Sequence, residues 1–369
     1  NFFTFLSASL LALVLCSCKT ATTPPVTEAP KNPYEAVEKK IARIQADFEI
    51  PALQVRVLER GDAKFNFSRG VRAIHQPTEL QPRDRFHLGP ASSAITAVLV
   101  AQLIDLKLMD WNTPLRSLLP KDTPIHLQHK DTTLEMILSQ KAGFADVQSL
   151  QGKKLWPQLY NMSTGAARAR LAKAILAAPP HFKPGTKSEA SLAAFVVLGW
   201  ILEEKTNFSW EDLAKNKIFL HLNMNDCGFG PVANAKAPAP DQPWGHISDK
   251  DGNLVAVKPG PQADFPAALH PASGLSCSLD DWAKFLEMIS QGFYRESTFL
   301  REETFTRLLS NIEDSPFTYG AFLRYDRSWA SGSALVLSGF NKMNDSFAAI
   351  APSREYTIIV LTNSGSKKA

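Results

Sequence analysis

The spacing of apolar residues changes along the chain and divides it into strand-rich ends and a helical middle. Residues 34–49 place apolar side chains at helical spacing with charged residues between them, which predicts an amphipathic helix. Residues 53–70 alternate apolar and polar side chains around a Gly-Asp turn, which predicts a β-hairpin. Helical spacing then prevails from about residue 91 to residue 222.

Strand patterns return towards the C-terminal end. Residues 245–257 predict a second hairpin, and residues 279–290 predict one further helix. Three more strands are predicted, at residues 334–340, 346–352 and 356–363. Because strands come from both chain ends, we predict an α/β (α+β) fold in which an antiparallel sheet built from both ends is flanked by helices. A mainly helical lobe is expected over about residues 90–242.

The composition is that of an ordinary globular protein. The chain has 369 residues, of which 44% are hydrophobic and 21% charged, so it can bury a large core. Its 40 basic and 36 acidic residues give a net charge of +4 without a long basic cluster. We therefore expect no nucleic-acid partner. The Lys/Arg-rich residues 166–175 are interpreted as the solvated face of a helix.

The N-terminal segment differs from the rest of the chain. Residues 2–15 form an apolar run too short to span a bilayer comfortably, as in signal peptides. The run ends in Leu-Cys-Ser-Cys, which resembles a lipobox, the recognition site for bacterial lipoprotein processing. We therefore predict a signal peptide at residues 1–17, a lipid on Cys18 and a flexible Thr/Pro/Ala-rich linker over residues 18–33. The alternative is a plain secretory signal with a chance cysteine.

These features predict a globular body, residues 34–369, that a lipid anchor holds to a membrane of the bacterial cell envelope, on its periplasmic or extracellular face. Lys19 directly after Cys18 is compatible with the outer membrane, if the organism has one. In such an oxidising compartment Cys227 and Cys277 can pair. Two independent buried thiols fit the sequence at least as well, because spacing alone does not place the two sulfurs together.

Five segments in a fixed order carry a family resemblance. They are residues 86–120 (FHLGPASSAITAVLVAQLIDLKLMDWNTPLRSLLP), 133–144 (TLEMILSQKAGF), 182–206 (FKPGTKSEASLAAFVVLGWILEEKT), 271–289 (PASGLSCSLDDWAKFLEMI) and 356–363 (YTIIVLTN). In this order the segments resemble the serine β-lactamase and penicillin-binding-protein superfamily, most closely its class C and esterase-like branch. The resemblance covers roughly residues 34–363 and implies a β-lactamase/transpeptidase-like fold with a serine hydrolase site.

The first motif of that family is S-x-x-K at the start of its central helix, where the lysine amine takes the proton of the serine nucleophile. Gly89 aligns with the glycine before the serine, so the serine position is Pro90 and the lysine position is Ser93. Pro90 has neither a side-chain heteroatom nor a backbone N–H, and Ser93 is not a base at neutral pH. The helix itself is expected to persist, because proline is tolerated in a first helical turn.

The second motif, Y-x-N or S-x-N, supplies a proton shuttle and a substrate-binding amide in that family. The equivalent positions here are Ala190, Ser191 and Leu192, and a shift by one residue still provides neither Tyr nor Asn. Only Ser191 can form a side-chain hydrogen bond.

The third motif, K-T-G or H-x-G, supplies the cation that binds the substrate carboxylate in that family. It falls at Leu337, Ser338 and Gly339, where the glycine remains and the cation is absent. All three motifs therefore lack their reactive groups, whereas the segments around them persist.

We predict a cell-envelope lipoprotein without an intact catalytic set. Ser92, Ser191, Ser338 and Gly339 are expected to line a cleft that binds a ligand such as a cell-wall peptide. Alternatively, the surface of the protein binds an envelope protein. A structural envelope protein that binds no small molecule is a further possibility.

The alternative is an active serine hydrolase, such as an esterase, a peptidase or a β-lactamase-like enzyme, with a relocated nucleophile. Ser92 and Ser93 are the candidates, although helix-capping and first-turn serines are the simpler interpretation. No cofactor and no metal ion are expected. The nearest histidine pair, His126 and His129, lacks the Cys or carboxylate neighbours of a zinc site.

Overall fold

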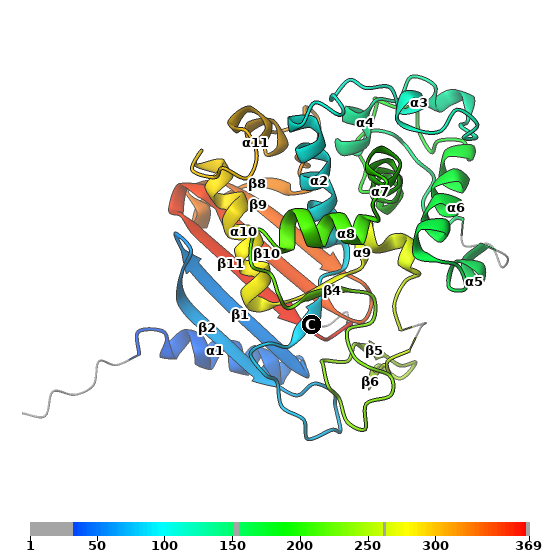
Figure 1. Ribbon diagram of the computed structural model, residues 1–369. Helices are drawn as coiled ribbons and strands as arrows, with labels where there is room; N and C mark the ends of the chain where they lie inside the picture. The colour runs from blue at the N-terminus through cyan, green and yellow to red at the C-terminus, as the bar shows by residue number, and fades with distance from the viewer. Residues whose placement is uncertain (1–31, 151–154, 261–262, 367–369) are drawn as a thin grey trace, which may run out of the picture.

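The central sheet of the protein is assembled from both ends of the chain. The computed structural model describes residues 32–150, 155–260 and 263–366. Within them a six-stranded antiparallel sheet has the order β2-β1-β11-β10-β9-β8. Its strands are β1 (Ala52–Glu59), β2 (Asp62–Gly70), β8 (Leu323–Arg327), β9 (Gly332–Phe340), β10 (Asp345–Ala351) and β11 (Tyr356–Thr362). The N-terminal hairpin pairs with the last strand, which confirms the sheet expected from the sequence (Figure 1).

Alternate residues of the central strands point to opposite faces of the sheet, and each face is covered by helices. Val55 of β1 lies opposite Val360 of β11, and both belong to a small apolar cluster that includes Ile41 of helix α1 (Glu35–Asp47). The neighbouring residue Ile359 belongs to the main core on the other face of the sheet, where α10 (Leu279–Phe293) packs. The period of two along each strand therefore sends apolar side chains to helices on both faces.

The helical lobe lies beside the sheet, at the upper right of Figure 1. Its helices are α2 (Ser93–Asp105), α3 (Leu115–Leu118), α4 (Leu134–Leu138), α5 (Leu155–Leu159), α6 (Thr164–Ala177), α7 (Leu192–Thr206) and α8 (Trp210–Ala214). A π-helical turn, Lys215–Phe219, follows α8 directly. Two shorter helices, α9 (His270–Ser273) and α11 (Glu302–Leu308), lie outside the lobe sequence.

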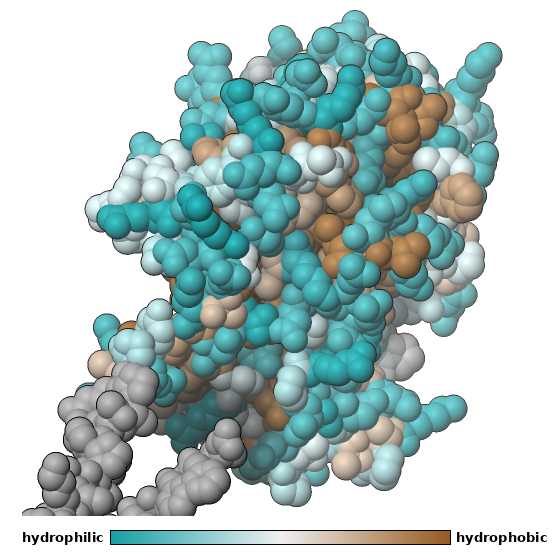
Figure 2. Space-filling view, turned by 60° about the vertical axis from the view of Figure 1, so that its left-hand side comes forward, coloured by the Kyte–Doolittle hydropathy of each residue, from teal (hydrophilic) through white to brown (hydrophobic). Residues whose placement is uncertain are grey.

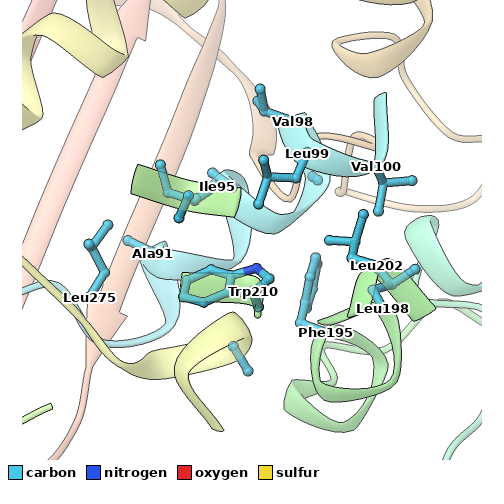
Figure 3. Packing of buried hydrophobic residues seen from close by; sticks show 14 of the residues in the cluster. Ala91, Ile95, Val98, Leu99, Val100, Phe195, Leu198, Leu202, Trp210 and Leu275 are labelled. Atoms are coloured by element: carbon cyan, nitrogen blue, oxygen red, sulfur yellow. The ribbon is translucent and has the colours of Figure 1, made fainter. Parts of the chain in front are cut away.

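Helices α2 and α7 form the centre of the main core. Both are largely apolar, and most of their residues are buried, as expected for helices at the centre of a core. In Figure 3, Phe195 of α7 lies between Trp210 and Leu198, and Leu99 of α2 lies above them. The Trp210 indole N–H donates to Thr96 Oγ1 at 3.0 Å, so this buried polar group is paired.

A short three-stranded sheet leads into α2. It has the order β3-β7-β4, with β3 (Arg85–His87), β7 (Leu275–Ser278) and β4 (Cys227–Phe229). Cys227 and Cys277 lie directly opposite each other in β4 and β7 and form a disulfide, so the first of the two possibilities for these cysteines holds. The hairpin expected at 245–257 is present as β5 (His246–Ser248) and β6 (Leu254–Ala256).

Arg168 corrects one expectation from the sequence. The basic residues of 166–175 were expected on a solvated helix face, yet the side chain of Arg168 in α6 is fully buried. Its guanidinium pairs with Glu203 of α7 and, at 2.6 Å, with Glu211 of α8. A buried charge is tolerable only with such partners, so the prediction was wrong at this residue.

The surface in Figure 2 is mostly hydrophilic, with apolar side chains gathered in separate patches. In the part of the chain that the structure describes, no helix is both long and apolar enough to cross a membrane. The proposed signal peptide and Cys18 lie outside the described residues.

Candidate functional site

The segment that leads into α2 contains a glycine, Gly89, that no other residue could replace without strain. Gly89 has a φ of +54°, and a Cβ atom there would lie 2.9 Å from the carbonyl carbon of Gly339 in β9. Pro90 follows in the first turn of a short 3₁₀ helix, Gly89–Ser92, that continues directly into α2. Proline fits this turn because its missing N–H would have no intrahelical partner.

Gly339 brings β9 against the same entry. A Cβ atom at Gly339 would lie 1.9 Å from the carbonyl oxygen of Leu88. Ser346 of the neighbouring strand β10 donates from Oγ to that carbonyl at 2.9 Å. This close backbone approach fixes β9 beside the start of α2. It also covers Gly339, which does not line the pocket described next.

The three degenerate motif segments meet at one pocket of about 260 Å³, here called the main pocket. It is lined by Pro90, Ser93, Gln140, Ala190, Ser191, Leu192, Phe195, Phe317, Ala321, Leu323, Val336, Leu337 and Ser338. The pocket is open, and its lining includes Pro90, Ala190 and Leu337, which the sequence predicts at the positions of the family's reactive groups. None of the described residues that line it carries a titratable side chain.

Ser92 lies behind the main pocket rather than in it. Its side chain is fully buried, and its Oγ donates to the carbonyl of Gly89 at 2.6 Å. The same oxygen accepts from the backbone N–H groups of Leu275 and Gly274 at 3.0 and 3.2 Å. Ser92 therefore joins the entry of α2 to β7, and the structure does not support the expectation that it lines the cleft.

Ser93 reaches the main pocket but is also held by the backbone. It is 5% exposed, and its Oγ donates to the carbonyl of Ala272 at 3.1 Å. One turn further along α2, Thr96 makes the same kind of bond to Pro271 at 2.6 Å. These hydroxyl bonds attach α2 to the segment around α9.

The second motif segment forms the N-terminal cap of α7. The Ser191 hydroxyl oxygen accepts from the N–H of Ala194 at 3.2 Å, as in an ordinary serine cap. The backbone N–H of Ser191 donates to Gln140 Oε1 at 2.9 Å. Ala190 and Leu192, where the family has a proton shuttle and an amide, contribute only apolar atoms to the pocket wall.

On the opposite wall, Leu337 of β9 occupies the position of the family's cation. It is 4% exposed and lies opposite Ala348 of β10. The next residue, Ser338, is exposed and also lines the main pocket. Together with Val336 and Leu323, this wall is largely apolar.

A second pocket of about 260 Å³, here called the side pocket, adjoins the main pocket. The two share four lining residues, namely Gln140, Ala190, Ser191 and Leu192. The side pocket is more polar, since its lining includes Asp146, His181 and Glu189. His181 Nε2 accepts from the N–H of Asp146 at 3.1 Å. The site can thus bind apolar groups and hydrogen-bond them at one side.

Two features of the site have no evident signal in the sequence. Gln140, at the C-terminal end of the TLEMILSQ segment, lies between the two pockets with a φ of +57°. His87 and Asp264 form a buried pair, with 2.9 Å between Nε2 and Oδ2. Because His87 Nδ1 accepts the Gly89 N–H, its proton is on Nε2 and is donated to Asp264. The pair supports the glycine before Pro90 from outside the main pocket.

The fold is that of the penicillin-recognising serine hydrolases. Helices cover both faces of its antiparallel sheet, the apolar helix α2 begins beside β9, and a pocket lies between this helix and β9. The sequence model of the Beta-lactamase family matches residues 37–369. The chain belongs to this family, which confirms the resemblance and the fold expected from the five segments.

Solved structures of the same fold are clearly similar. A penicillin-binding protein homologue from Pyrococcus abyssi, described as octameric, superposes with a TM-score of 0.72 and 21% identity, over 90% of this chain and 74% of that one. The penicillin binding protein from Bacillus halodurans has a TM-score of 0.71 and 18% identity, over 89% of this chain and 96% of that one. At these identities the likeness concerns the fold.

Sequence relatives are similarly distant, and they are longer than this chain. Unguisins hydrolase ungD' of Aspergillus campestris is 24% identical over 269 residues, which cover 70% of this chain and 48% of that protein. Protein flp of Staphylococcus aureus is 20% identical over 343 residues, which cover 92% of this chain and 65% of that protein. The chain thus spans about half to two thirds of the length of these relatives.

Proposed function

We propose that this protein is a non-catalytic, ligand-binding member of the β-lactamase family that is attached to the bacterial cell envelope by a lipid on Cys18. One observation carries the proposal. The main pocket is open, yet none of the described residues that line it can accept a proton at neutral pH. A pocket of this kind can hold a ligand but has no group to start acyl transfer.

The chemistry of acyl transfer explains why these losses matter together. A serine hydroxyl needs an adjacent base before it can attack a carbonyl, and Pro90 supplies no hydroxyl at all. Proline also lacks the backbone N–H that would stabilise an oxyanion at this position. Ser93 lies where the base belongs, and its hydroxyl proton is donated to Ala272.

An active enzyme with a relocated serine is less well supported. Ser92 is fully buried with all its bonds to the backbone, so a substrate carbonyl cannot reach it without rearrangement of α2. Ser338 is accessible, but no titratable residue shares the main pocket with it in the described part of the chain.

We propose a cell-wall peptide as the occupant, with an envelope protein as the second candidate. The support is the shape of the fold, which is shared with the penicillin-binding protein homologues named above. The test incubates the mature protein with purified cell-wall peptides, follows the midpoint of thermal unfolding and analyses the peptides by chromatography. We expect the midpoint to rise while the peptides stay intact. Peptide cleavage above the level of a heat-denatured control would contradict the proposal.

The envelope location rests on the N-terminal motif and on one feature of the body. The disulfide between Cys227 and Cys277 supports an oxidising compartment, because cytosolic proteins rarely keep structural disulfides. Metabolic labelling with a fatty acid tests the anchor. We expect Cys18→Ala to abolish the label, whereas the matched variant Cys16→Ala, two residues away, should retain it. A label that persists in Cys18→Ala would rule out the anchor.

A further inference from the structure

Among the described residues, Gln140 is the one polar side chain that lines both pockets from a buried position. It is 5% exposed and lines the main pocket and the side pocket. Its Oε1 accepts the N–H of Ser191 at 2.9 Å, which fixes the orientation of the amide, because the NH₂ end cannot accept this bond. The Nε2 end has no hydrogen-bond partner among the described residues. This amide is therefore prepared to donate to an acceptor that enters the pockets.

The charged residues around Gln140 do not form a site that would bind a carboxylate. The main pocket has no charged lining residue among those described. The side pocket is lined by two acidic residues, Asp146 and Glu189, and Glu189 is paired with Lys187 at 2.5 Å. An anionic ligand would lose water here without gaining a counter-charge, which is unfavourable.

The apolar residues that line the main pocket favour a ligand with an apolar group. Leu192, Phe195, Phe317 and Leu337 face the same space that Gln140 borders. An apolar group of a ligand gains there by leaving water. The geometry therefore combines one unpaired amide donor with an uncharged apolar surface.

Building on the proposed binding function, we infer that the two pockets bind a neutral amide that carries an apolar group, and that they discriminate against the corresponding carboxylate. The apolar group occupies the main pocket, and the amide carbonyl accepts from Gln140 Nε2. A peptide bond next to an apolar side chain meets this description, whereas a free C-terminal carboxylate does not.

A matched pair of small probes tests the inference. Hydrocinnamamide and hydrocinnamate share one apolar skeleton and differ only in the amide or carboxylate end. We expect the amide to bind the full-length protein at least tenfold more tightly than the carboxylate at neutral pH, as measured by ligand-observed NMR titration. Equal affinity, or tighter binding of the carboxylate, overturns the inference and leaves the binding function standing. If neither probe binds while cell-wall peptides raise the unfolding midpoint, the inference alone fails; if none of these ligands binds, both proposals fail.

Lysine variants supply a second, independent test. Leu337→Lys and Ser338→Lys each place an ammonium group at the main pocket, and Ser338 is exposed, so its variant should fold even if the other does not. We expect either variant to bind the carboxylate at least tenfold more tightly than the wild type does. Leu127→Lys, at a 76% exposed position outside the pockets, is the matched control and should leave both affinities unchanged. An unchanged ratio of the two affinities in the folded pocket variants would refute the charge argument.

Gln140→Glu examines the donor itself. A glutamate keeps an oxygen for the Ser191 N–H but has no N–H₂ group to offer a ligand. We expect the affinity for hydrocinnamamide to fall at least tenfold, while circular dichroism shows the same fold. Undiminished amide binding by this variant would show that Gln140 is not the donor.

Discussion

At the scale of single residues, Pro90 shows that the start of α2 accepts a residue without a nucleophilic side chain. The first turn of a helix does not use the backbone N–H at this position, so proline is structurally acceptable. The glycine before it is constrained much more strongly, by its positive φ and by the backbone of Gly339. The geometry of the fold therefore requires glycine at position 89 and does not require a nucleophile at position 90.

Restoring the first motif should not restore acyl transfer. The double variant Pro90→Ser, Ser93→Lys would regain the serine and the lysine, but Leu337 and Ala190 would still provide neither a cation nor a proton shuttle. We expect no covalent adduct with a fluorescent penicillin on a denaturing gel, while circular dichroism shows a folded protein. A labelled band would mean that the rest of the pocket is still competent.

At the scale of elements, a buried ionic network ties three helices to the segment before β7. Arg168 of α6 pairs with Glu203 and Glu211, and His270 of α9 lies 2.7 Å from Glu211. Burial acts to raise the pKa of both glutamates. At Glu211 the hydrogen bond from His270 and the charge of Arg168 outweigh burial and lower the pKa to about 2, whereas at Glu203 burial prevails and the pKa is raised.

Breaking this network should be costly. Arg168→Ala leaves two buried carboxylates without their cation, which is expected to reduce the free energy of unfolding by about 3–5 kcal/mol. Arg170→Ala, on the exposed side of the same helix, is the control and should change it by less than about 0.5 kcal/mol. Urea titration measures both values. A loss below about 1 kcal/mol for Arg168→Ala would show that the pairs contribute little.

Most helices and strands could be predicted from the sequence, but this ionic network could not. The alternation in β1, β2 and β9–β11 and the apolar spacing of α2 and α7 are local patterns, so these elements could be predicted. The burial of Arg168 depends on Glu203, which is 35 residues away, so no local sequence pattern predicts it. Gln140 and the pair of His87 with Asp264 were missed for the same reason. The motif positions lining the pocket were predictable because they follow from fixed spacings, but whether the pocket stays open depends on packing.

At the scale of the whole molecule, two buried histidines make stability depend on pH. Burial is the main cause that lowers the pKa of His129 and of His246 to about 4 each. His246 is held as a neutral imidazole, since its Nε2 accepts from Ile74 N–H and its Nδ1 lies 2.8 Å from the Asn363 carbonyl. In the unfolded chain both histidines would titrate near pH 6.5.

Stability should therefore decline on mild acidification. A folded-state pKa below the unfolded value means that this contribution is full above about pH 6.5 and is lost progressively as the pH falls towards about 4. The loss amounts to at most about 3 kcal/mol for each histidine. We expect His129→Leu to lessen the decline seen by urea titration across this range, and the exposed variant His221→Leu to leave it unchanged. An identical decline in His129→Leu would contradict the assignment.

The most direct measurement of the central claim is the intact mass of the purified wild-type protein after incubation with excess benzylpenicillin and, separately, with a fluorophosphonate. The absence of a proton acceptor among the described residues that line the main pocket predicts an unchanged mass in both cases. A stoichiometric mass increase, mapped by peptide sequencing to Ser92, Ser93 or Ser338, would contradict it.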